Sequence, residues 1–577
     1  MEKREALRRF IEVATGREPA DTVIRNCRIV DVCNGEIVEG DLALFDGKIV
    51  GIGTYEAREV IDGEGLYAAP GFIDSHIHIE SSYVTPEEIS RILVPHGGTT
   101  IVADPHEIVN VCGLRGLEYM IRAGKETPLD IQYMLPSCVP ATPFEHSGAV
   151  IDAEAMKEPI ASADILGLGE FMNFPGILNA DPAVLDKLVL AQEAGKVIDG
   201  HAPALSGKAL NAYAGTGILA DHECATAEEL RERIRKGMYV MLREGSACHD
   251  LRNLLKGVTP ANARYCVLCS DDRQPHTMFT EGHLDNHLRI CVEEGIDPIT
   301  ALQMATINAA TCFRLHDRGS LTPGKRADLV LLEDLKDFRV RRVFTAGKLT
   351  AQDGRYLPQV RRVDAAEVKG SVVLKDFSVE KLRMHLRSDE VNVIAIQPGG
   401  VVTQKQTAHI RRDETGDFVR EPEKDLVKVA VVERHQGTGN VATGLLRGYG
   451  IQSGAVALSI AHDSHNIITV GVSDEEMAFA VRQLEAQEGG IVLVKDGAVV
   501  ASMPLPIAGL MSDQSAEWVD SQLALLHEKA HEELGISRAV EPIMTLCFMS
   551  LAVIPELKLT DMGLFDVTQF RFIPTEA

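Results

Sequence analysis

Two histidines separated by one residue carry the strongest chemical signal in this sequence. His76 and His78 lie in the run PGFIDSHIHIESS, residues 70–82. On a β-strand, side chains two positions apart point to the same face, so both imidazoles would lie on one side. Neutral imidazoles that converge in this way are good ligands for Zn, Mn or Fe. The pair alone is a weak indication of a metal site, because hydrogen-bonded histidines are common in proteins.

The same kind of position recurs further along the chain. A residue able to bind a metal closes a short apolar run at Glu170 (ILGLGE), His201 (VIDGHA), His222 (ILADHE) and Asp271 (VLCSDD). Each of these alone is more often an ordinary hydrogen-bonded polar group. Their common position favours a shared site, because the active sites of β/α barrels form at the carboxyl ends of the strands. We therefore predict that these side chains and the two histidines form a metal centre.

The elements that would position these side chains form an alternating series. From residue 71 to about residue 319, apolar runs such as TTIVADP and DIQYMLP alternate with amphipathic stretches such as PAVLDKLVLAQEAG. Strands and helices in alternation are typical of a parallel sheet, and so many repeats favour a closed one. We predict an α/β fold in which residues 71–319 form a (β/α)8, TIM-like barrel. The charged stretch EELRERIRK is interpreted as the solvated face of one of its helices.

Segments of β character flank the predicted barrel. In residues 1–70, apolar runs are separated by Asn34-Gly35 and Asp46-Gly47, dipeptides that favour hairpin turns. Similar runs return in residues 320–365, so we expect the two segments to form one discontinuous, β-sandwich-like small domain. Residues 366–577 are β-rich with a helical segment near 513–535, which predicts an extra C-terminal α+β domain.

The composition of the chain argues against some classes of binding partner. The chain has 577 residues with 84 acidic and 58 basic side chains, giving a formal net charge of −26. This charge argues against nucleic acid or an anionic membrane surface as the main partner. No stretch resembles a membrane span, and the opening MEKREALRRFIEVATG has mixed charges, which predicts an amphipathic helix and not a signal peptide. The expected compartment is the cytoplasm.

The cysteines do not form a disulfide pattern. Their number is 11, which leaves at least one unpaired, and their spacing over so long a chain indicates reduced thiols. The close pair Cys266 and Cys269 lies in an apolar, strand-like run and has no second pair to complete a zinc site. We interpret it as structural.

These motifs together resemble a known family. The PGFIDSHIH start, the series of strand-end ligands and the flanking β segments resemble the amidohydrolase superfamily. More narrowly, the runs HIHIESS, VADPHEI, GLGEFM, DGHAP, ADHE and AHDSHN resemble the bacterial adenine deaminases over essentially the whole chain. The resemblance implies hydrolysis of adenine to hypoxanthine and ammonia with two divalent metal ions, Mn or Fe, or else Zn. It also implies a homo-oligomer, such as a dimer, and a C-terminal domain that completes or covers the active site.

The resemblance also implies roles for individual residues. His76 and His78 would hold one metal, and His201 and His222 the other. Glu170 would bridge both metals, where many superfamily members have a carboxylated lysine. Asp271 would ligate the first metal and move the proton of the attacking water, so that Asp271 and Glu170 are the expected catalytic residues.

Substrate contacts are open to two interpretations each. Asp272 either hydrogen-bonds a ring nitrogen of the purine or is a solvated or Arg273-paired loop carboxylate. Four residues lie just past strand ends and either contact substrate or proton-relay groups or only hold loops: Glu80, Asp104, His106 and Glu107. In the segment AHDSHN, residues 461–466, Ser464 or His465 belongs either to a lid over the site or to a turn with satisfied side chains.

Other functions remain to be weighed against this one. The same metal centre could act on another amino-heterocycle or a cyclic amide, because the ligands specify hydroxide chemistry and not the ring. A catalytically silent scaffold would be expected to lose ligands, and this sequence retains every candidate. The motif HEKAH at 527–531 matches HExxH, but the apolar stripe of its helix predicts that both histidines lie beside the stripe or in solvent, against a metalloprotease site.

Overall fold

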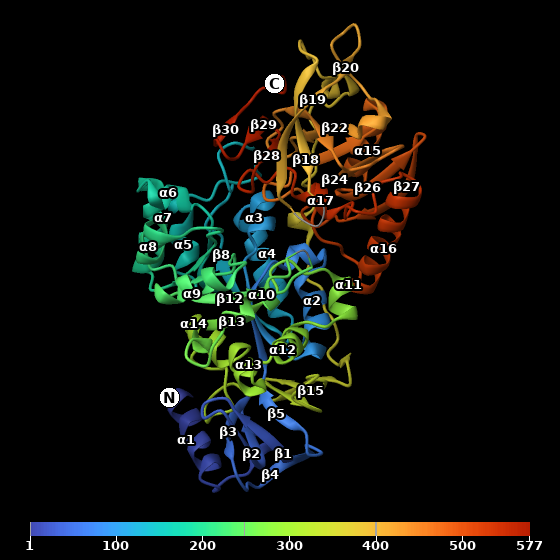
Figure 1. Cartoon of the computed structure of the whole chain (residues 1–577). Coiled ribbons are helices and arrows are strands. Elements are labelled where there is room, and N and C mark those ends of the chain that lie inside the picture. Colours follow the sequence, from blue (N-terminus) through green and yellow to red (C-terminus); the bar gives the residue numbers. More distant parts are fainter. Residues whose placement is uncertain (1, 247, 398–400) are drawn as a thin grey trace.

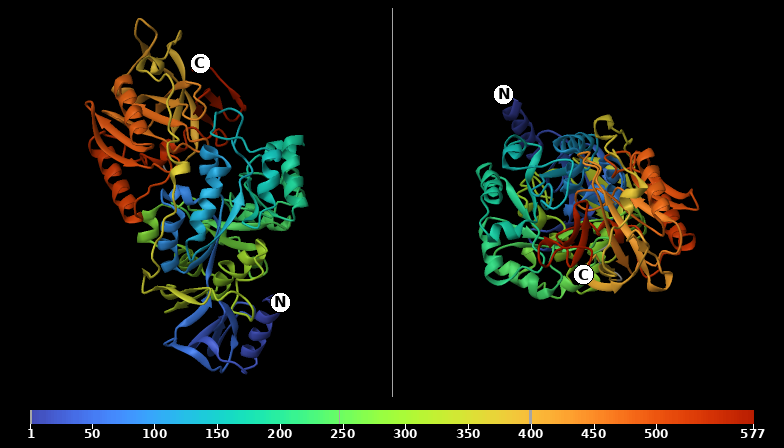
Figure 2. Two further views of the ribbon diagram at one scale, coloured as in Figure 1. Left: turned by 180° about the vertical axis from the view of Figure 1, so that it is seen from behind. Right: turned by 90° about the horizontal axis from the view of Figure 1, so that it is seen from above.

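A computed structural model describes residues 2–246, 248–397 and 401–577 of the chain. Figure 1 shows three parts stacked along one direction, with the N-terminal strands at one end, a strand-and-helix layer in the middle and the C-terminal sheet at the other end. The view from behind in Figure 2 shows the same order. The middle part therefore lies between the two others.

The middle part is a closed parallel barrel. Its eight strands are β6 (Phe72–Ile77), β7 (Gly98–Ala103), β8 (Asp130–Leu135), β9 (Ile165–Phe171), β10 (Val197–Gly200), β11 (Ala220–Asp221), β12 (Tyr239–Arg243) and β13 (Cys266–Cys269). β6 to β10 form one ladder and β11 to β13 another. The ladders join where Leu219 N donates to Ile198 O at 3.0 Å and where Asp271 N donates to His76 O at 2.9 Å. The predicted (β/α)8 fold class is confirmed.

Helices follow the barrel strands and cover the outside of the barrel. They include α2 (Pro86–Leu93), α3 (His106–Cys112), α4 (Leu114–Lys125), α5 (Ala153–Ile160), α6 (Phe174–Leu178), α7 (Pro182–Glu193), α8 (Gly207–Gly215), α9 (Ala227–Arg235), α10 (Leu251–Leu255), α11 (Pro275–Thr280), α12 (Leu284–Glu293), α13 (Pro298–Met304) and α14 (Ile307–Cys312). The strands are buried on both faces and consist of short apolar runs, as expected of parallel strands between helices.

One helix departs from the sequence interpretation. The charge pattern predicts that the charged run on α9 is solvated, but the Arg233 side chain is fully buried. Its Nε donates to Asp221 Oδ2 at 2.9 Å and its Nη2 donates to Ala202 O at 2.7 Å. A buried guanidinium needs such partners, and they come from the ends of β10 and β11, which a helix-face pattern does not reveal.

The two β segments around the barrel share one nine-stranded sheet. It contains β1 (Ala20–Asp31), β2 (Glu36–Phe45), β3 (Lys48–Ile52), β4 (Ala57–Asp62), β5 (Tyr67–Pro70), β14 (Leu329–Leu332), β15 (Val340–Thr345), β16 (Lys348–Gln352) and β17 (Arg355–Tyr356). The segments meet where β14 pairs antiparallel with β5, with Leu329 opposite Pro70. Helix α1 (Glu2–Ala14) precedes this sheet in the chain.

The C-terminal part is built on an eight-stranded sheet in the order β19-β18-β23-β22-β25-β24-β26-β27. Its strands are β18 (Glu390–Ile396), β19 (Thr403–His409), β22 (Leu426–Val432), β23 (Val441–Arg447), β24 (Ala455–Leu458), β25 (Ile467–Gly471), β26 (Gly490–Lys495) and β27 (Ala498–Pro504). Helices α15 (Asp474–Ala486) and α16 (Ala516–Glu532) pack on this sheet. The smaller elements are β20 (Arg411–Arg412), β21 (Phe418–Val419), α17 (Met544–Cys547), β28 (Leu557–Thr560), β29 (Gly563–Asp566) and β30 (Arg571–Phe572).

The barrel and the C-terminal part share a core. One cluster of buried apolar side chains contains Ile89 and Ile108 of the barrel helices together with Val519 and Leu546 of the C-terminal helices. Glu88 on α2 accepts hydrogen bonds from Arg362 in the connecting segment and from the Ala516 N–H at the start of α16. The C-terminal sheet is therefore held against the barrel by both apolar and polar contacts.

Candidate metal centre

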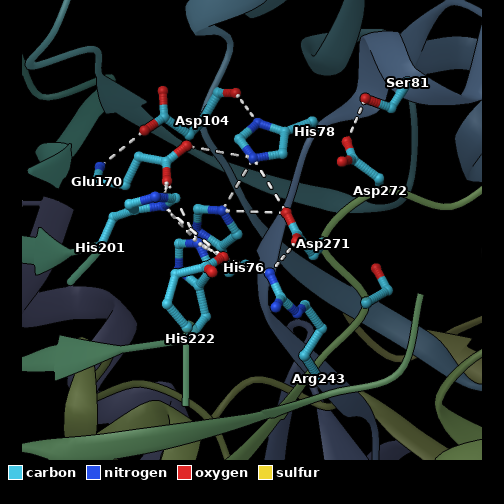
Figure 3. A network of polar contacts seen from close by, with 12 residues as sticks. His76, His78, Ser81, Asp104, Glu170, His201, His222, Arg243, Asp271 and Asp272 are labelled. Carbon is cyan, nitrogen blue, oxygen red and sulfur yellow. Dashed lines mark hydrogen bonds and ion pairs between the residues drawn. The ribbon is translucent and has the colours of Figure 1, made fainter. Parts of the chain in front are cut away.

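Histidines and carboxylates from five barrel strands converge at the carboxyl ends of those strands. His76 is on β6 and His78 follows it, Glu170 is on β9, and His201, His222 and Asp271 follow β10, β11 and β13. Figure 3 shows these side chains pointing toward one another. The imidazoles of His76 and His222 stack with their ring centroids 4.1 Å apart. Residues far apart in the sequence thus form one compact polar group.

Glu170 lies between two pairs of histidines. Its Oε2 is 2.7 Å from His201 Nδ1 and 3.3 Å from His222 Nε2, while its Oε1 is 3.4 Å from His78 Nε2. Within the pairs, His76 Nε2 is 3.1 Å from His78 Nε2, and His201 Nδ1 is 3.2 Å from His222 Nε2. One carboxylate therefore faces both pairs.

The hydrogen bonds on the outer side of His76 and His78 fix which ring nitrogen points inward. His76 Nδ1 donates to Asp199 Oδ2 at 3.1 Å, and His78 Nδ1 donates to Asp104 O at 2.9 Å. In the neutral rings both Nε2 atoms then carry lone pairs, and these face each other across 3.1 Å. Two lone pairs at this distance repel unless a cation lies beside them, and such outer hydrogen bonds are typical of metal-binding histidines. The donor set therefore fits a divalent metal ion.

The charged neighbours of Glu170 keep it ionised. Burial raises the pKa of this carboxyl, but the charge of His201 and hydrogen bonds from the surrounding imidazoles lower it well below its usual range. A carboxylate rather than a carboxylic acid is the form that binds metals.

Asp271 has its two oxygens in different surroundings. Its Oδ1 is 3.3 Å from His78 Nε2 and 3.8 Å from His76 Nε2, and its Oδ2 accepts a hydrogen bond from Arg243 Nη1 at 2.9 Å. Burial raises the pKa of Asp271, but the neighbouring His78 and the Arg243 charge lower it well below its usual range. Its backbone has φ +56°, a left-handed conformation that is uncommon outside glycine and often marks functional sites.

Asp104 and His106 also contact the centre. Asp104 Oδ2 accepts a hydrogen bond from the Glu170 N–H at 2.8 Å, while its carbonyl orients His78. Asp104 thus holds two of the predicted ligands in place. His106 Nδ1 lies 3.2 Å from Glu170 Oε1, so His106 is beside the carboxylate predicted to bridge two metals.

Glu80 and Glu107 lie in a second buried group beside the centre. Glu80 Oε1 accepts a hydrogen bond from the Ile108 N–H at 3.1 Å, and its other oxygen has no partner among the described residues. Burial and the nearby Glu107 charge raise the pKa of Glu80 to about 7. Glu107 Oε1 is 3.4 Å from His106 Nε2, which links this group to the centre.

The segment 461–466 of the C-terminal part reaches this second group. His462 Nδ1 contacts Glu107 Oε1 at 2.7 Å, and His465 Nε2 contacts the other Glu107 oxygen. His465 Nδ1 accepts from the Ala461 N–H, so the His465 proton is on Nε2 and is donated to Glu107. The Ser464 hydroxyl is buried and has no partner among the described residues. The segment therefore touches the barrel site through its histidines.

Asp272 is bonded to Ser81 and not to its neighbour Arg273. Ser81 Oγ donates to Asp272 Oδ1, whereas Arg273 donates to Glu244 O and Gly282 O, both at 2.8 Å. The Arg273-paired interpretation of Asp272 is therefore wrong. Asp272 lines a small pocket together with Ser81, Tyr83, Gln274, His462 and Phe548.

The HEKAH helix has other contacts. His527 Nε2 lies 2.6 Å from Glu541 Oε1, whereas His531 Nδ1 donates to Ile536 O at 3.0 Å. The two imidazoles are thus engaged with different groups, and Val519, Leu523, Leu526 and Ala530 of the same helix are buried. The cysteines of the chain are all free, and Cys266 and Cys269 are buried on β13.

Sequence reasoning did not select three residues at the centre. Asp199 orients His76, Glu223 Oε1 lies 3.5 Å from His222 Nε2, and Arg243 contacts both Glu223 and Asp271. Each of them ends or follows a short apolar run, in VIDG, ILADHE and YVMLR. The strand-end rule that selected the histidines would have found them if it had been applied to every polar residue there.

No helix in the described part of the chain is long and apolar enough to cross a membrane.

Comparison with known proteins identifies the family of the chain. Residues 67–350 match the model of the amidohydrolase family, and residues 400–571 match the adenine deaminase C-terminal domain. The chain is 62% identical to "Adenine deaminase 2" of Desulfotalea psychrophila, over 100% of both chains. It is 50% identical to "Adenine deaminase" of Ligilactobacillus salivarius over 100% of both chains, and 50% identical to that of Nitratidesulfovibrio vulgaris (strain DP4) over 99% of both. Identity of this extent over the full length shows that the chain belongs to the adenine deaminase family of the amidohydrolases.

Proposed function

We propose that this protein hydrolyses adenine to hypoxanthine and ammonia, a reaction of purine salvage. The full-length relatives named adenine deaminase support the substrate. The observation that carries the chemistry is the pair of inward lone pairs on His76 and His78, 3.1 Å apart beside a buried carboxylate.

We propose two divalent ions at this centre, Mn or Fe, with Zn as the other choice. His76, His78 and Asp271 would hold one ion and His201 and His222 the other, with Glu170 between them. When bound, such ions would lower the pKa of a coordinated water from about 15.7 toward 7, which would provide hydroxide at neutral pH. The imidazole and carboxylate donors suit all three metals, so the sequence and geometry favour none of them alone.

Asp271 is the proposed proton carrier. Attack of the water oxygen on C6 of adenine would form the C6–O bond, and the two protons of the water would go to ring N1 and, by way of Asp271 Oδ1, to the exocyclic nitrogen. That nitrogen then leaves as ammonia while the C6–O bond is retained in hypoxanthine. Proton transfer by a positioned side chain contributes about 10²–10⁴-fold to a rate.

The purine ring is proposed to lie between the metal centre and the pocket beside Asp272. Asp272, fixed by Ser81, would accept a hydrogen bond from the ring. On the other side Glu107, held by His462 and His465 of the C-terminal segment, would face a ring nitrogen. His106 would contact both Glu107 and Glu170, and Glu80 would hold the start of α3 through the Ile108 N–H. The C-terminal part in this proposal completes the site and, with Ser464, covers it.

The assembly and the compartment are also proposals. We propose a homo-oligomer, most simply a dimer, located in the cytoplasm; both proposals rest on the resemblance to the adenine deaminases. Light scattering of the purified protein measures the oligomeric state directly.

The decisive experiment combines metal analysis with an ammonia assay. Purified protein should contain up to two divalent ions per chain and release ammonia from adenine, with hypoxanthine formed in equal amount. A chelator should abolish the activity, and Mn, Fe or Zn should restore it. A protein that binds metal but releases nothing from adenine, while opening a cyclic amide or deaminating another heterocycle, would replace the substrate proposed here. A folded, metal-free and inactive protein would indicate a scaffold.

A further inference from the structure

Arg243, the last residue of β12, joins two carboxylates at the metal centre. Its Nη1 donates to Asp271 Oδ2 at 2.9 Å and also to Glu223 Oε1. The other edge of the guanidinium is held by Asp250, whose Oδ2 accepts from Nε at 3.2 Å and from Nη2 at 3.0 Å. Figure 3 shows Arg243 reaching Asp271 from below the histidines. The side chain is therefore fixed at both edges.

This arrangement makes the two oxygens of Asp271 unequal. Oδ2 is engaged by a planar group that stays charged at every working pH. Oδ1 is left toward His76 and His78, at 3.8 and 3.3 Å. The backbone of Asp271 is tied to β6, because its N–H donates to His76 O and its carbonyl accepts from His78 N. Strand pairing fixes the backbone only, so the orientation of the carboxylate about its side-chain bonds depends on Arg243.

We propose that Arg243 is a positioning residue, which holds Oδ2 of Asp271 so that Oδ1 alone faces the reacting water and the leaving nitrogen. This inference rests on the proposed deamination and deepens it. Arg243 does not contact the substrate in this scheme; it acts through Asp271. Because a misplacement of about 1 Å in a reacting group costs about 10²-fold in rate, loss of this hydrogen bond should lower kcat much more than it changes KM.

The surroundings of Arg243 offer a specific test. Arg243 lines a cavity of about 840 Å³ between barrel loops and the C-terminal helices, together with Ser246, Cys248, Asp250, Gln274 and Met544. If the side chain is shortened, a free guanidinium ion can enter from this cavity and occupy the vacated position. Its planar donors can bind Asp271 and Asp250 as the side chain did, whereas methylammonium lacks that geometry.

The experiment compares Arg243→Ala, Arg243→Lys and wild type, each loaded with the same metal. Arg243→Ala should keep the wild-type metal content and a KM within about threefold, while kcat falls about 10²-fold. Guanidinium chloride, well below unfolding concentrations, should restore part of kcat and raise the thermal midpoint of this variant; methylammonium chloride at equal ionic strength should do neither. The kcat of Arg243→Lys should lie between those of Arg243→Ala and wild type, because lysine keeps the positive charge but lacks the planar set of N–H donors.

Other outcomes would overturn the inference. These are a kcat of Arg243→Ala within about threefold of wild type, a loss of metal in proportion to the loss of activity, or no effect of guanidinium on the folded, metal-loaded variant. If Arg243→Ala does not fold, Asp250→Asn replaces it: Asp250 is partly exposed, and its loss should lower kcat by a smaller factor at unchanged metal content. Failure of the wild type itself to release ammonia from adenine would reject the proposed function, whereas the thermal response to guanidinium tests Arg243 independently of it.

Discussion

At the scale of single residues, the proposed metal centre depends on groups outside the proposed ligand set. Asp199 and the Asp104 carbonyl each accept the outer proton of a histidine, which leaves the inner nitrogen free as a ligand. Such outer contacts are typically worth 10–100-fold in metal affinity or activity. Residues that surround the proposed ligands therefore fix how the imidazole rings are oriented.

Substitutions of Asp199 test how much the outer hydrogen bond of His76 contributes to metal binding. Asp199→Ala removes the acceptor of the His76 Nδ1 proton, and the metal should bind about 10–100-fold more weakly. Asp199→Asn keeps an oxygen that can accept the same hydrogen bond and should weaken binding less. Metal titration of the apo forms measures both. Equal affinity in wild type and Asp199→Ala would show that His76 is oriented in another way.

Asp271 tests the proton transfer. Asp271→Asn keeps the shape and the contact to Arg243 but cannot carry a proton, so turnover should fall by about 10²–10⁴-fold while most of the metal is retained. Ammonia release and metal content of the same sample check this. Deamination by the Asn variant at near the parent rate would assign the proton transfer to another group.

At the scale of elements, the fully buried strands are mostly apolar, and polar groups lie at their ends and in loops. An exception is Lys558 on β28, which is fully buried. Its Nζ donates to Val401 O and Phe548 O, both at 2.9 Å, and burial lowers its pKa to about 7 from the ordinary value of 10.5. This strand therefore holds a buried amine without a carboxylate partner within hydrogen-bonding distance among the described residues.

Because its pKa is lowered on folding, Lys558 makes the stability of the protein depend on pH in a direction that can be predicted. Between pH about 7 and 10.5 the unfolded chain holds the Lys558 proton more strongly than the folded chain does, so this group makes stability rise with pH across that window. Lys558→Met should remove this rise in the thermal midpoint. Lys495→Met, at a partly exposed position, is the control and should leave the rise in place. Parallel curves for wild type and Lys558→Met would contradict the prediction.

At the scale of the whole molecule, the barrel and the C-terminal part pack against each other through a shared core. Glu88 is the polar contact at this junction: it is buried, and it bonds Arg362 at 2.8 Å, Arg91 at 2.9 Å and the Ala516 N–H at 3.2 Å. Removal of the C-terminal part would therefore expose the apolar surface of the barrel as well as remove the contacts to Glu107.

A substitution at Glu88 tests this coupling without truncation. Glu88→Ala removes hydrogen bonds to charged groups worth about 1.5–3 kcal/mol each and should lower the thermal midpoint by several degrees. Metal content should be unchanged, because Glu88 lies outside the centre. Glu517→Ala, which removes an exposed partner of Arg91, should change the midpoint much less. Equal effects of the two would mean that the junction does not limit stability.

The sequence by itself determined the barrel and most of the candidate centre. Apolar runs with polar ends predict parallel strands. When such strands close into a barrel, their carboxyl ends lie on one face, and this brings together His76, Glu170, His201 and Asp271. Fold class and family followed from these local patterns, because each pattern spans only a few neighbouring residues. The roles of the individual side chains stay predictions.

Only the tertiary structure decided which partners these residues have. Glu107 meets His465 across 358 residues of chain, and the burial of Arg233 and the bond from Ser81 to Asp272 likewise join separate elements. The same holds for Arg243, whose contact to Asp271 no local pattern reveals. The strand pattern determines on which face and at which end of a strand a side chain lies. Its hydrogen-bonding partner depends on which other element packs there, and that is decided by the packing of the complete chain.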